Sequence, residues 1–487
     1  MILYKTINTT MTLRAIILTF LITATVYSCK QEQSSEVKQN TSETKEFSLP
    51  EWAISANLYE LNTRQFSQEG NFQAIIDELP RLKSMGVDII WLMPVQPISM
   101  KNRKAKGDLM VEDIDDPEER KKYLGSPYAV GDYLKINPDY GDPSKFKELV
   151  KKAHAQDMYL IIDWVPNHTG WDNPWITDHP EWYTKDDDGN IIDPIDYNTG
   201  KSWGWTDVAD LNFDNQEMRQ AMIDAMKFWL TEYDIDGFRV DVAHGVPQDF
   251  FDSLTPALTD VKDDIFLLAE SNVESHRNNK TYHATYGWEF HHLMNEIARG
   301  EKPVKEIQHW YEKDKSRYKE GFHIHFTSNH DENTWAGTVF ERMGDGHKAL
   351  AVLAATLEGM PLVYNGQEEP LRKRLEFFVK DPIDWKDYAY TEFYKGLFDL
   401  KDDNKALWNG KHGSDPVFEY IDDKSIVFSR TKDDNKVIVI LNLSKDAHAI
   451  PFSFNDKAFS EMNGKQLLTD EEGMIKMDPW SYLIYTK

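Results

Sequence analysis

Short apolar runs that suit β-strands alternate with longer segments of helical periodicity from about residue 50 onward. The strand candidates are residues 57–64, 87–95, 159–167, 237–243, 265–271, 322–330 and 361–369, with a weaker one at 285–292. Between several of them, apolar residues recur every three or four positions, as in 71–86 and 215–233, which is typical of amphipathic helices. Alternating strands and helices indicate a parallel sheet, and eight such units indicate a closed (β/α)8 barrel, or TIM barrel, over residues 50–404.

Two segments depart from this alternation. Residues 169–214 follow the third strand candidate and are rich in Trp, Asp and Gly, so we expect a small inserted B subdomain over the barrel mouth. After about residue 405 the chain changes to short alternating strands separated by turns, as in 424–444 and 481–487. This pattern predicts a C-terminal antiparallel β-sandwich domain over 405–487.

The amino terminus predicts export and a lipid anchor. Arg14 precedes an apolar run that ends near residue 26, and this run is too short for a comfortable transmembrane helix. Residues 1–28 therefore read as a signal peptide. The chain's single cysteine, Cys29, follows directly and resembles the lipidated cysteine of a bacterial lipobox; an ordinary signal peptide with a chance cysteine is the alternative. Residues 29–49 are polar and aperiodic, as in a flexible tether. We expect a lipid-anchored protein of the cell envelope, at the outer membrane or cell surface.

Composition narrows the classes of ligand. The formal net charge of −27 argues against a nucleic-acid-binding protein, which would carry a basic face. Fifteen tryptophans and 22 tyrosines would provide flat rings on which sugars stack, or would simply fill a large core.

Polar side chains stand at the carboxyl ends of most of the strand candidates, and most of them are carboxylates and histidines. They are Arg64, Asn167, His168, Asp241, Glu270, His330, Asp331 and Glu368. The carboxyl ends of barrel strands meet at one mouth, so we expect these groups to converge there. Asp241 and Glu270 would be neighbours, and two facing carboxylates suit glycoside hydrolysis. Arg239 shares a strand face with Asp241 and would keep it ionised, unless the pair is only a buried salt bridge.

Four motifs in order carry a family resemblance. They are DWVPNHTG (163–170), GFRVDVAHG (237–245), LLAESN (267–272) and TSNHDEN (327–333), and they resemble the four conserved regions of glycoside hydrolase family 13, the α-amylase superfamily. The resemblance implies that Asp241 is the nucleophile, Glu270 the general acid and base, and Asp331 the group that stabilises the transition state.

The same resemblance implies four substrate-binding residues. Arg239 would orient the nucleophile, His168 and His330 would hydrogen-bond the sugar being cleaved, and Tyr128 would stack beneath it. As alternatives, the two histidines are satisfied core residues and Tyr128 is a packing residue.

The resemblance also implies a structural calcium ion, although the chemistry itself requires no cofactor. Asn167, Asp210 and a backbone carbonyl at His244 occupy the corresponding places, and oxygen ligands suit Ca²⁺. A metal-free hydrogen-bond network at these residues is the alternative.

These observations predict a retaining hydrolase of α-glucosidic bonds, acting on starch-like α-glucans or maltooligosaccharides. Val242 and Ala243 after the nucleophile leave α-1,6 bonds open beside α-1,4 bonds. A transglycosylase, glucanotransferase or glucosyl isomerase with the same triad is one alternative. A non-catalytic carbohydrate-binding or transport-accessory protein is another, but it would be expected to have lost a triad carboxylate. A metallohydrolase would need clustered histidines, and HIH (323–325) lies early in its strand, at the wrong end for catalysis.

Overall fold

The computed structural model describes residues 47–487, except for 108, 197–198, 453–459 and 462–472. The signal peptide, Cys29 and most of the predicted tether lie outside the described residues. Within the described part, the search for a helix of sufficient length and apolarity to span a membrane found none.

Eight parallel strands close into a barrel, which confirms the predicted fold. In their order around the barrel they are β1 (Leu58–Leu61), β2 (Ile89–Leu92), β5 (Tyr159–Trp164), β10 (Gly237–Val240), β11 (Phe266–Ala269), β12 (Ala284–Tyr286), β13 (Phe322–His325) and β14 (Met360–Tyr364), which pairs with β1. Almost every residue of these strands is buried, because helices cover the sheet outside and side chains fill it inside.

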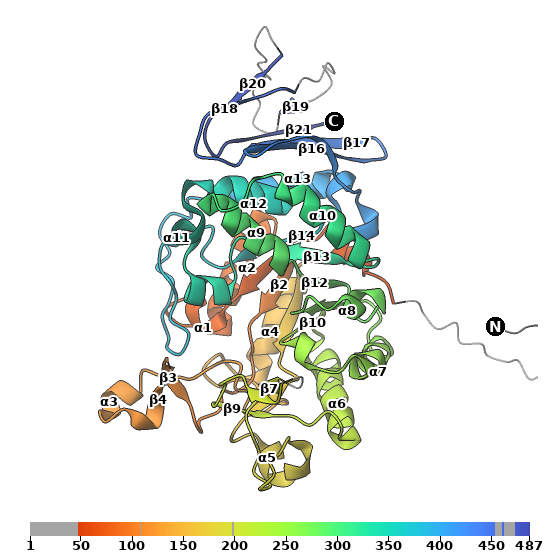
Figure 1. The fold of residues 1–487 in the computed structure, drawn as a ribbon. Coiled ribbons are helices and arrows are strands. Elements are labelled where there is room, and N and C mark those ends of the chain that lie inside the picture. Colours follow the sequence, from red (N-terminus) through yellow and green to blue (C-terminus); the bar gives the residue numbers. More distant parts are fainter. Residues whose placement is uncertain (1–46, 108, 197–198, 453–459, 462–472) are drawn as a thin grey trace, which may run out of the picture. The chain divides into compact units, whose positions relative to one another are not determined.

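The helices between the strands form the outer layer (Figure 1). The longer ones are α2 (Phe72–Met85), α4 (Pro143–His154), α6 (Gln216–Tyr233), α7 (Gln248–Thr259), α9 (Trp288–Arg299), α10 (Glu306–Arg317), α12 (His347–Thr356) and α13 (Thr391–Asp403). Shorter helices are α1 (Thr63–Phe66), α3 (Pro117–Arg120), α5 (Pro174–Asp178), α8 (Glu274–Asn278) and α11 (Val339–Met343). In α2, the Asn71 side chain accepts the N–H of Ala74 at one end and Gly86 ends the helix with a φ of 92°.

The weak strand candidate at 285–292 does contain a strand, but the strand is shorter than predicted. Only Thr285 and Tyr286 belong to β12, and from Trp288 the chain is helical as α9. The side chains of Phe290, Leu293 and Ile297 are buried at helical spacing, so the apolar residues after Gly287 followed the period of a helix and not that of a strand.

The segment after β5 forms small paired strands beside the barrel mouth. β6 (His168–Gly170) pairs with β9 (Val208–Asp210), and between them β7 (Ile195–Asp196) pairs with β8 (Lys201–Ser202). A second excursion, between β2 and β5, contains β3 (Lys104–Lys106) and β4 (Leu109–Met110).

The C-terminal region is an antiparallel sheet with a small second sheet against it. Five strands lie in the order β15 (Val417–Ile421), β16 (Ser425–Lys432), β17 (Asn435–Asn442), β21 (Tyr482–Thr486) and β19 (Ser460–Glu461), while β18 (His448–Ile450) pairs with β20 (Ile475–Met477). In β16, Ile426 and Phe428 join the barrel's core and Val427 packs in a cluster with residues of the small sheet. The five-stranded sheet is therefore covered on both faces.

A close approach between the barrel strands β10 and β11 requires a glycine, and this yields a prediction. Gly237 has a φ of 145°, and a Cβ there would lie 1.9 Å from the carbonyl oxygen of Phe266 in β11. We expect Gly237→Ala to lower the free energy of unfolding by roughly 4 kcal/mol or more, because backbone must move to relieve the clash. Thermal unfolding followed by circular dichroism would measure the loss.

Gly300 supplies the matched control. Its φ of 75° is also positive, but a Cβ there would meet nothing within 4 Å, so Gly300→Ala should cost only about 1–2 kcal/mol. Similar losses in the two variants would contradict the role assigned to the β10–β11 contact.

Candidate active site

Asp241 and Glu270 stand side by side at the carboxyl end of the barrel. They directly follow β10 and β11, whose last residues Val240 and Ala269 are paired. The N–H of Asp241 donates to the Trp164 carbonyl at 2.8 Å and that of Glu270 to the Val240 carbonyl at 2.9 Å. The sheet hydrogen bonds thus continue through both residues, and rigid strands hold the two carboxylates.

The Arg239 guanidinium lies beneath the two carboxylates and contacts both. Its Nη1 donates to Asp241 Oδ1 at 2.6 Å and to Asp163 Oδ1 at 2.9 Å, and its Nη2 lies 3.0 Å from Glu270 Oε2. The Arg239 side chain is completely buried, and its Nε donates to the Tyr286 hydroxyl at 3.0 Å. Three carboxylates therefore share one buried cation, which fixes their relative positions.

Val242, directly after the predicted nucleophile, adopts a left-handed backbone conformation. Its φ of 44° and ψ of 40° are unfavourable for a β-branched residue and cost of order 1–3 kcal/mol. This conformation turns the N–H of Val242 toward the predicted acid, where it donates to Glu270 Oε2 at 2.9 Å. Backbone strain at Val242 thus coincides with a direct contact to the predicted acid.

The protonation of the two carboxyls differs from the expectation based on Arg239 alone. Burial raises the pKa of Asp241 well above its usual range, and the attraction of Arg239 does not offset it. Burial also acts to raise the pKa of Glu270, but Arg239 and the Val242 N–H outweigh it and lower that pKa. In this arrangement Asp241 is therefore the better holder of a proton shared by the pair.

His330 connects the site to a carboxylate inside the barrel. Its Nδ1 lies 2.5 Å from Glu60 Oε1 in β1, and its Nε2 lies 2.9 Å from the Tyr128 hydroxyl. Burial acts to lower the pKa of His330, but the charges of Asp331 and Glu60 raise it to about 9. The imidazole is thus a cation at neutral pH, which leaves the Tyr128 hydroxyl to donate to Asp163 Oδ2 at 3.0 Å.

Glu60 was missed in the sequence. The polar strand ends drew attention to Arg64, whereas Glu60 lies inside the apolar run 57–64 and is completely buried. A carboxylate within a buried strand is itself a signal, because such a group needs a charged partner.

A cavity of about 350 Å³ opens above these groups. Six of the residues predicted for catalysis or substrate binding line it, namely Tyr128, His168, Asp241, Glu270, His330 and Asp331. Arg239 lies below, out of reach of solvent. Other residues that line the cavity and were not singled out in the sequence are Lys104, Gly107, Ser126, Trp205, Asp207, Val208, Val242, Trp335, Phe377 and Phe378. Most of these come from loops, whose course a sequence pattern does not reveal.

His168 and Asp331 offer contrasting polar groups to the cavity. Burial lowers the pKa of His168 to about 3, so its imidazole is neutral and can only exchange ordinary hydrogen bonds. The side chain of Asp331 is 38% exposed and lies 3.5 Å from His330 Nε2. It is the most open carboxylate of the predicted triad.

Two polar strand ends do not join the mouth, and the expected convergence was wrong for them. Arg64 Nη1 donates to the Gly125 carbonyl at 3.1 Å and Nη2 donates to the Phe377 carbonyl. Glu368 is completely buried, where it accepts the Tyr59 hydroxyl at 2.5 Å and contacts Arg81. Both side chains are used in packing the barrel and its loops.

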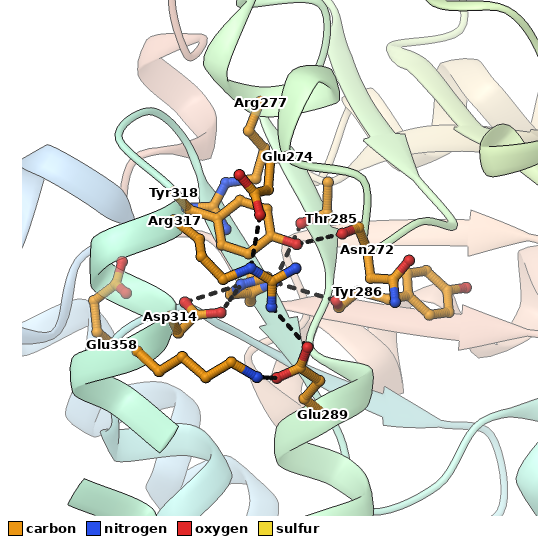
Figure 2. A network of polar contacts seen from close by, with 12 residues as sticks. Asn272, Glu274, Arg277, Thr285, Tyr286, Glu289, Asp314, Arg317, Tyr318 and Glu358 are labelled. Atoms are coloured by element: carbon orange, nitrogen blue, oxygen red, sulfur yellow. Dashed lines mark hydrogen bonds and ion pairs between the residues drawn. The ribbon is translucent and has the colours of Figure 1, made fainter. Parts of the chain in front are cut away.

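A separate polar network fixes the loop after Glu270 from outside the barrel (Figure 2). The Tyr318 hydroxyl donates to the Asn272 carbonyl at 2.6 Å, and Arg317 Nε donates to Glu274 Oε1 at 2.8 Å. Arg317 Nη1 also reaches Glu289 Oε1 at 2.7 Å. The end of α10 therefore holds residues 272–274, which lie just beyond the predicted acid.

The histidines of HIH (323–325) are used in structural contacts. His323 Nε2 lies 3.1 Å from both carboxylate oxygens of Asp314, and His325 Nε2 lies 2.8 Å from the Glu358 carbonyl. Within the residues that the structure describes, the search for three or more His, Cys, Asp or Glu side chains able to hold a metal ion found none.

The three residues predicted for calcium lie close together. Asp210 pairs with His168 across β6 and β9, and His168 is next to Asn167 in the chain. A Cβ on Gly245 would lie 2.7 Å from Asn167 Oδ1. The backbone directly after His244 therefore lies beside the Asn167 side chain. Alone they supply two oxygen-bearing side chains and a carbonyl, fewer than the six to eight oxygens that Ca²⁺ takes. Calcium stays a prediction, and no catalytic step depends on it.

Comparison with known proteins agrees with this geometry. The family model described as "Alpha amylase, catalytic domain" matches residues 40–388. The chain is 24% identical to "Alpha-amylase 3" of Dictyoglomus thermophilum over 89% of this chain and 93% of that protein. It is 27% identical to an alpha-1,4-glucan:maltose-1-phosphate maltosyltransferase of Picrophilus torridus, over 81% of this chain but only 61% of that protein's length.

Solved structures show the same fold. An α-amylase from Lactobacillus plantarum aligns with a TM-score of 0.76 at 23% identity, over 90% of this chain and 99% of that one. A maltogenic α-amylase from Thermotoga neapolitana aligns with a TM-score of 0.74 at 23% identity, over 89% and 98%. Since the family model covers well over half of the sequence, the chain belongs to the α-amylase family, glycoside hydrolase family 13.

Proposed function

We propose that the chain is a retaining glycoside hydrolase that cleaves α-glucosidic bonds in starch-like α-glucans or maltooligosaccharides. The observation that carries the proposal is the pair Asp241 and Glu270, held by the two terminal nitrogens of one buried guanidinium at the floor of a cavity. Two adjacent carboxyls on rigid strands suit double displacement through a covalent intermediate.

In the first step, a carboxylate oxygen of Asp241 attacks the anomeric carbon and the bond to the leaving oxygen breaks. Glu270 gives its proton to that oxygen, so the leaving sugar departs neutral. In the second step, Glu270 takes a proton from water, the hydroxide equivalent attacks the same carbon, and Asp241 is released. Asp331, which lines the same cavity, would stabilise the oxocarbenium-like transition state through its negative charge.

The reaction needs charge on Asp241 and a proton on Glu270, the reverse of what their pKa directions favour in this arrangement. The ion pair of Glu270 with Arg239 and the hydrogen bond that Glu270 accepts from the Val242 N–H are what favour its ionised form. If a sugar oxygen bound Glu270 in place of Arg239 and the Val242 N–H, the shared proton would move to Glu270. Arg239 would then stabilise the negative charge of Asp241 alone. Productive binding would thus set the protonation state that the first step requires.

Transfer to a sugar acceptor is the second candidate. It uses the same glycosyl-enzyme, with a sugar hydroxyl in place of water, and relatives of this chain include proteins named maltosyltransferase and intracellular maltogenic amylase. A glucosyl isomerase would use the same intermediate. The complete triad Asp241, Glu270 and Asp331 speaks against a purely carbohydrate-binding protein. Val242 and Ala243 keep both α-1,4 and α-1,6 bonds open as targets.

Replacement of the nucleophile tests the proposal. Asp241→Ala should lower the release of reducing sugar from maltooligosaccharides by at least about a thousandfold, since no covalent intermediate can form. The matched control is Asp224→Ala on the exposed face of α6, which should retain full activity. NMR of the fresh product should show the α-anomer; undiminished activity in Asp241→Ala or a β-anomeric product would sink the mechanism.

A pH profile tests the role of His330. With a pKa near 9, His330 keeps its charge at neutral pH and loses it as the pH rises through 9, so kcat/KM should fall on that alkaline side. Glu60→Gln removes a charge that raises this pKa, and the alkaline limb should move down by roughly one pH unit. An unchanged limb would show that His330 does not govern it.

The lipid anchor on Cys29 is also a proposal. Incorporation of a radiolabelled fatty acid by cells that produce the protein should be lost in Cys29→Ser and kept in Ser28→Ala. If the parent protein takes up no label, the anchor is refuted and only export by a signal peptide remains.

A further inference from the structure

Three aromatic residues at the rim of the cavity have no part in the proposed chemistry. Trp335 follows β13, and Phe377 and Phe378 follow β14; all three line the cavity. Trp335 is 56% exposed and is the only aromatic residue among the large hydrophobic side chains that the described part of the chain leaves exposed. Its ring centroid lies 5.3 Å from that of Phe377 and 6.1 Å from that of Phe378. An exposed apolar surface that continues a cavity marks a binding surface.

These rings extend the surface of Tyr128. The Phe377 ring lies 6.2 Å from the Tyr128 ring and is nearly parallel to it, with 5° between the planes. Flat rings offer sugars a broad apolar contact surface. Tyr128, Phe377 and Trp335 therefore form a stepped aromatic ledge that leads from the reaction centre to solvent.

The position of Tyr128 gives the ledge its direction. The family resemblance places Tyr128 beneath the sugar that becomes attached to Asp241, and the Tyr128 ring stacks on that of His330. From Tyr128 the ledge continues to Phe377 and Trp335, in the loops after β14 and β13. It would accompany the part of the substrate that stays bound to Asp241.

The ledge is held in place before any sugar binds. The Thr334 hydroxyl donates to the Leu375 carbonyl at 2.8 Å, and the Leu375 N–H donates to Asn333 Oδ1 at 2.9 Å, which joins the loops after β13 and β14. The Leu124 N–H donates to the Phe378 carbonyl at 2.7 Å. The buried Arg64 binds the Phe377 carbonyl. A surface fixed in this way costs little ordering entropy when it binds a ligand.

We propose that Trp335 and Phe377 bind at least one glucosyl unit beyond the unit attached to Asp241, and so make the protein select maltooligosaccharides over single glucosides. This inference rests on the proposed function. It adds chain-length selection by two residues, Trp335 and Phe377, that lie outside the four sequence motifs.

Binding to an inactive protein tests the ledge without turnover. In the Asp241→Asn background, titration calorimetry with maltopentaose should show binding that Trp335→Ala weakens roughly tenfold, because a stacking contact of about 1.4 kcal/mol is lost. Trp335→Tyr keeps a ring and should stay within about threefold. Leu134→Ala, which removes an exposed apolar side chain outside the cavity, is the control and should change nothing. Absence of binding, or binding that Trp335→Ala leaves unchanged, would overturn the ledge.

Turnover by the active protein gives the second readout. Trp335→Ala should lower kcat/KM for maltopentaose roughly tenfold and leave that for 4-nitrophenyl α-glucoside unchanged, because a single glucosyl unit above Tyr128 does not reach Trp335. A wild-type protein that cleaves maltopentaose but not the aryl glucoside would also support the proposal. Equal losses on both substrates would overturn it. A wild-type protein that cleaves neither would overturn the hydrolase proposal, while the calorimetry would still decide the ledge.

Discussion

The buried Arg239 is the constraint on which the site depends. A guanidinium inside a barrel is stable only if anions and hydrogen-bond acceptors surround it, and here Asp163, Asp241, Glu270 and the Tyr286 hydroxyl do so. Each of these partners comes from a different place along β5, β10, β11 or β12. Neutralisation of the Arg239 charge therefore fixes the relative positions of four neighbouring strand ends, and two of the carboxyl groups face the cavity.

His330 forms the second charged centre of the barrel. Its partners Glu60 and Tyr128 belong to β1 and to the excursion before β5, so it joins β1 to the loops of the barrel mouth. Tyr128 links the two centres, because its hydroxyl lies between His330 and Asp163. The hydrogen bonds that orient one carboxylate are thus coupled to the charge of an imidazole across the mouth.

The sequence predicted the elements whose periodicity is strong and the residues that end buried strands. Asp241, Glu270 and His330 could be assigned to the barrel mouth because each follows an apolar strand, and the carboxyl ends of barrel strands meet there. Arg64 and Glu368 carried the same signal and lie elsewhere, since strand-end position alone does not distinguish a residue that lines a cavity from one that binds loop carbonyls. Trp335 and Phe377 could not be found, because their proximity to Tyr128 depends on how two loops pack.

The C-terminal sheet has a consequence for how the chain reaches its native state. Its β21 (Tyr482–Thr486) is separated from β17 along the chain by β18, β19 and β20, yet it lies inside the sheet, between β17 and β19. The apolar side chains of β16 and β17 that face the barrel's helices belong to the same core as α12 and α13. Until β21 pairs with it, β17 therefore presents a strand edge with unpaired N–H and C=O groups, which could pair with a strand of another chain.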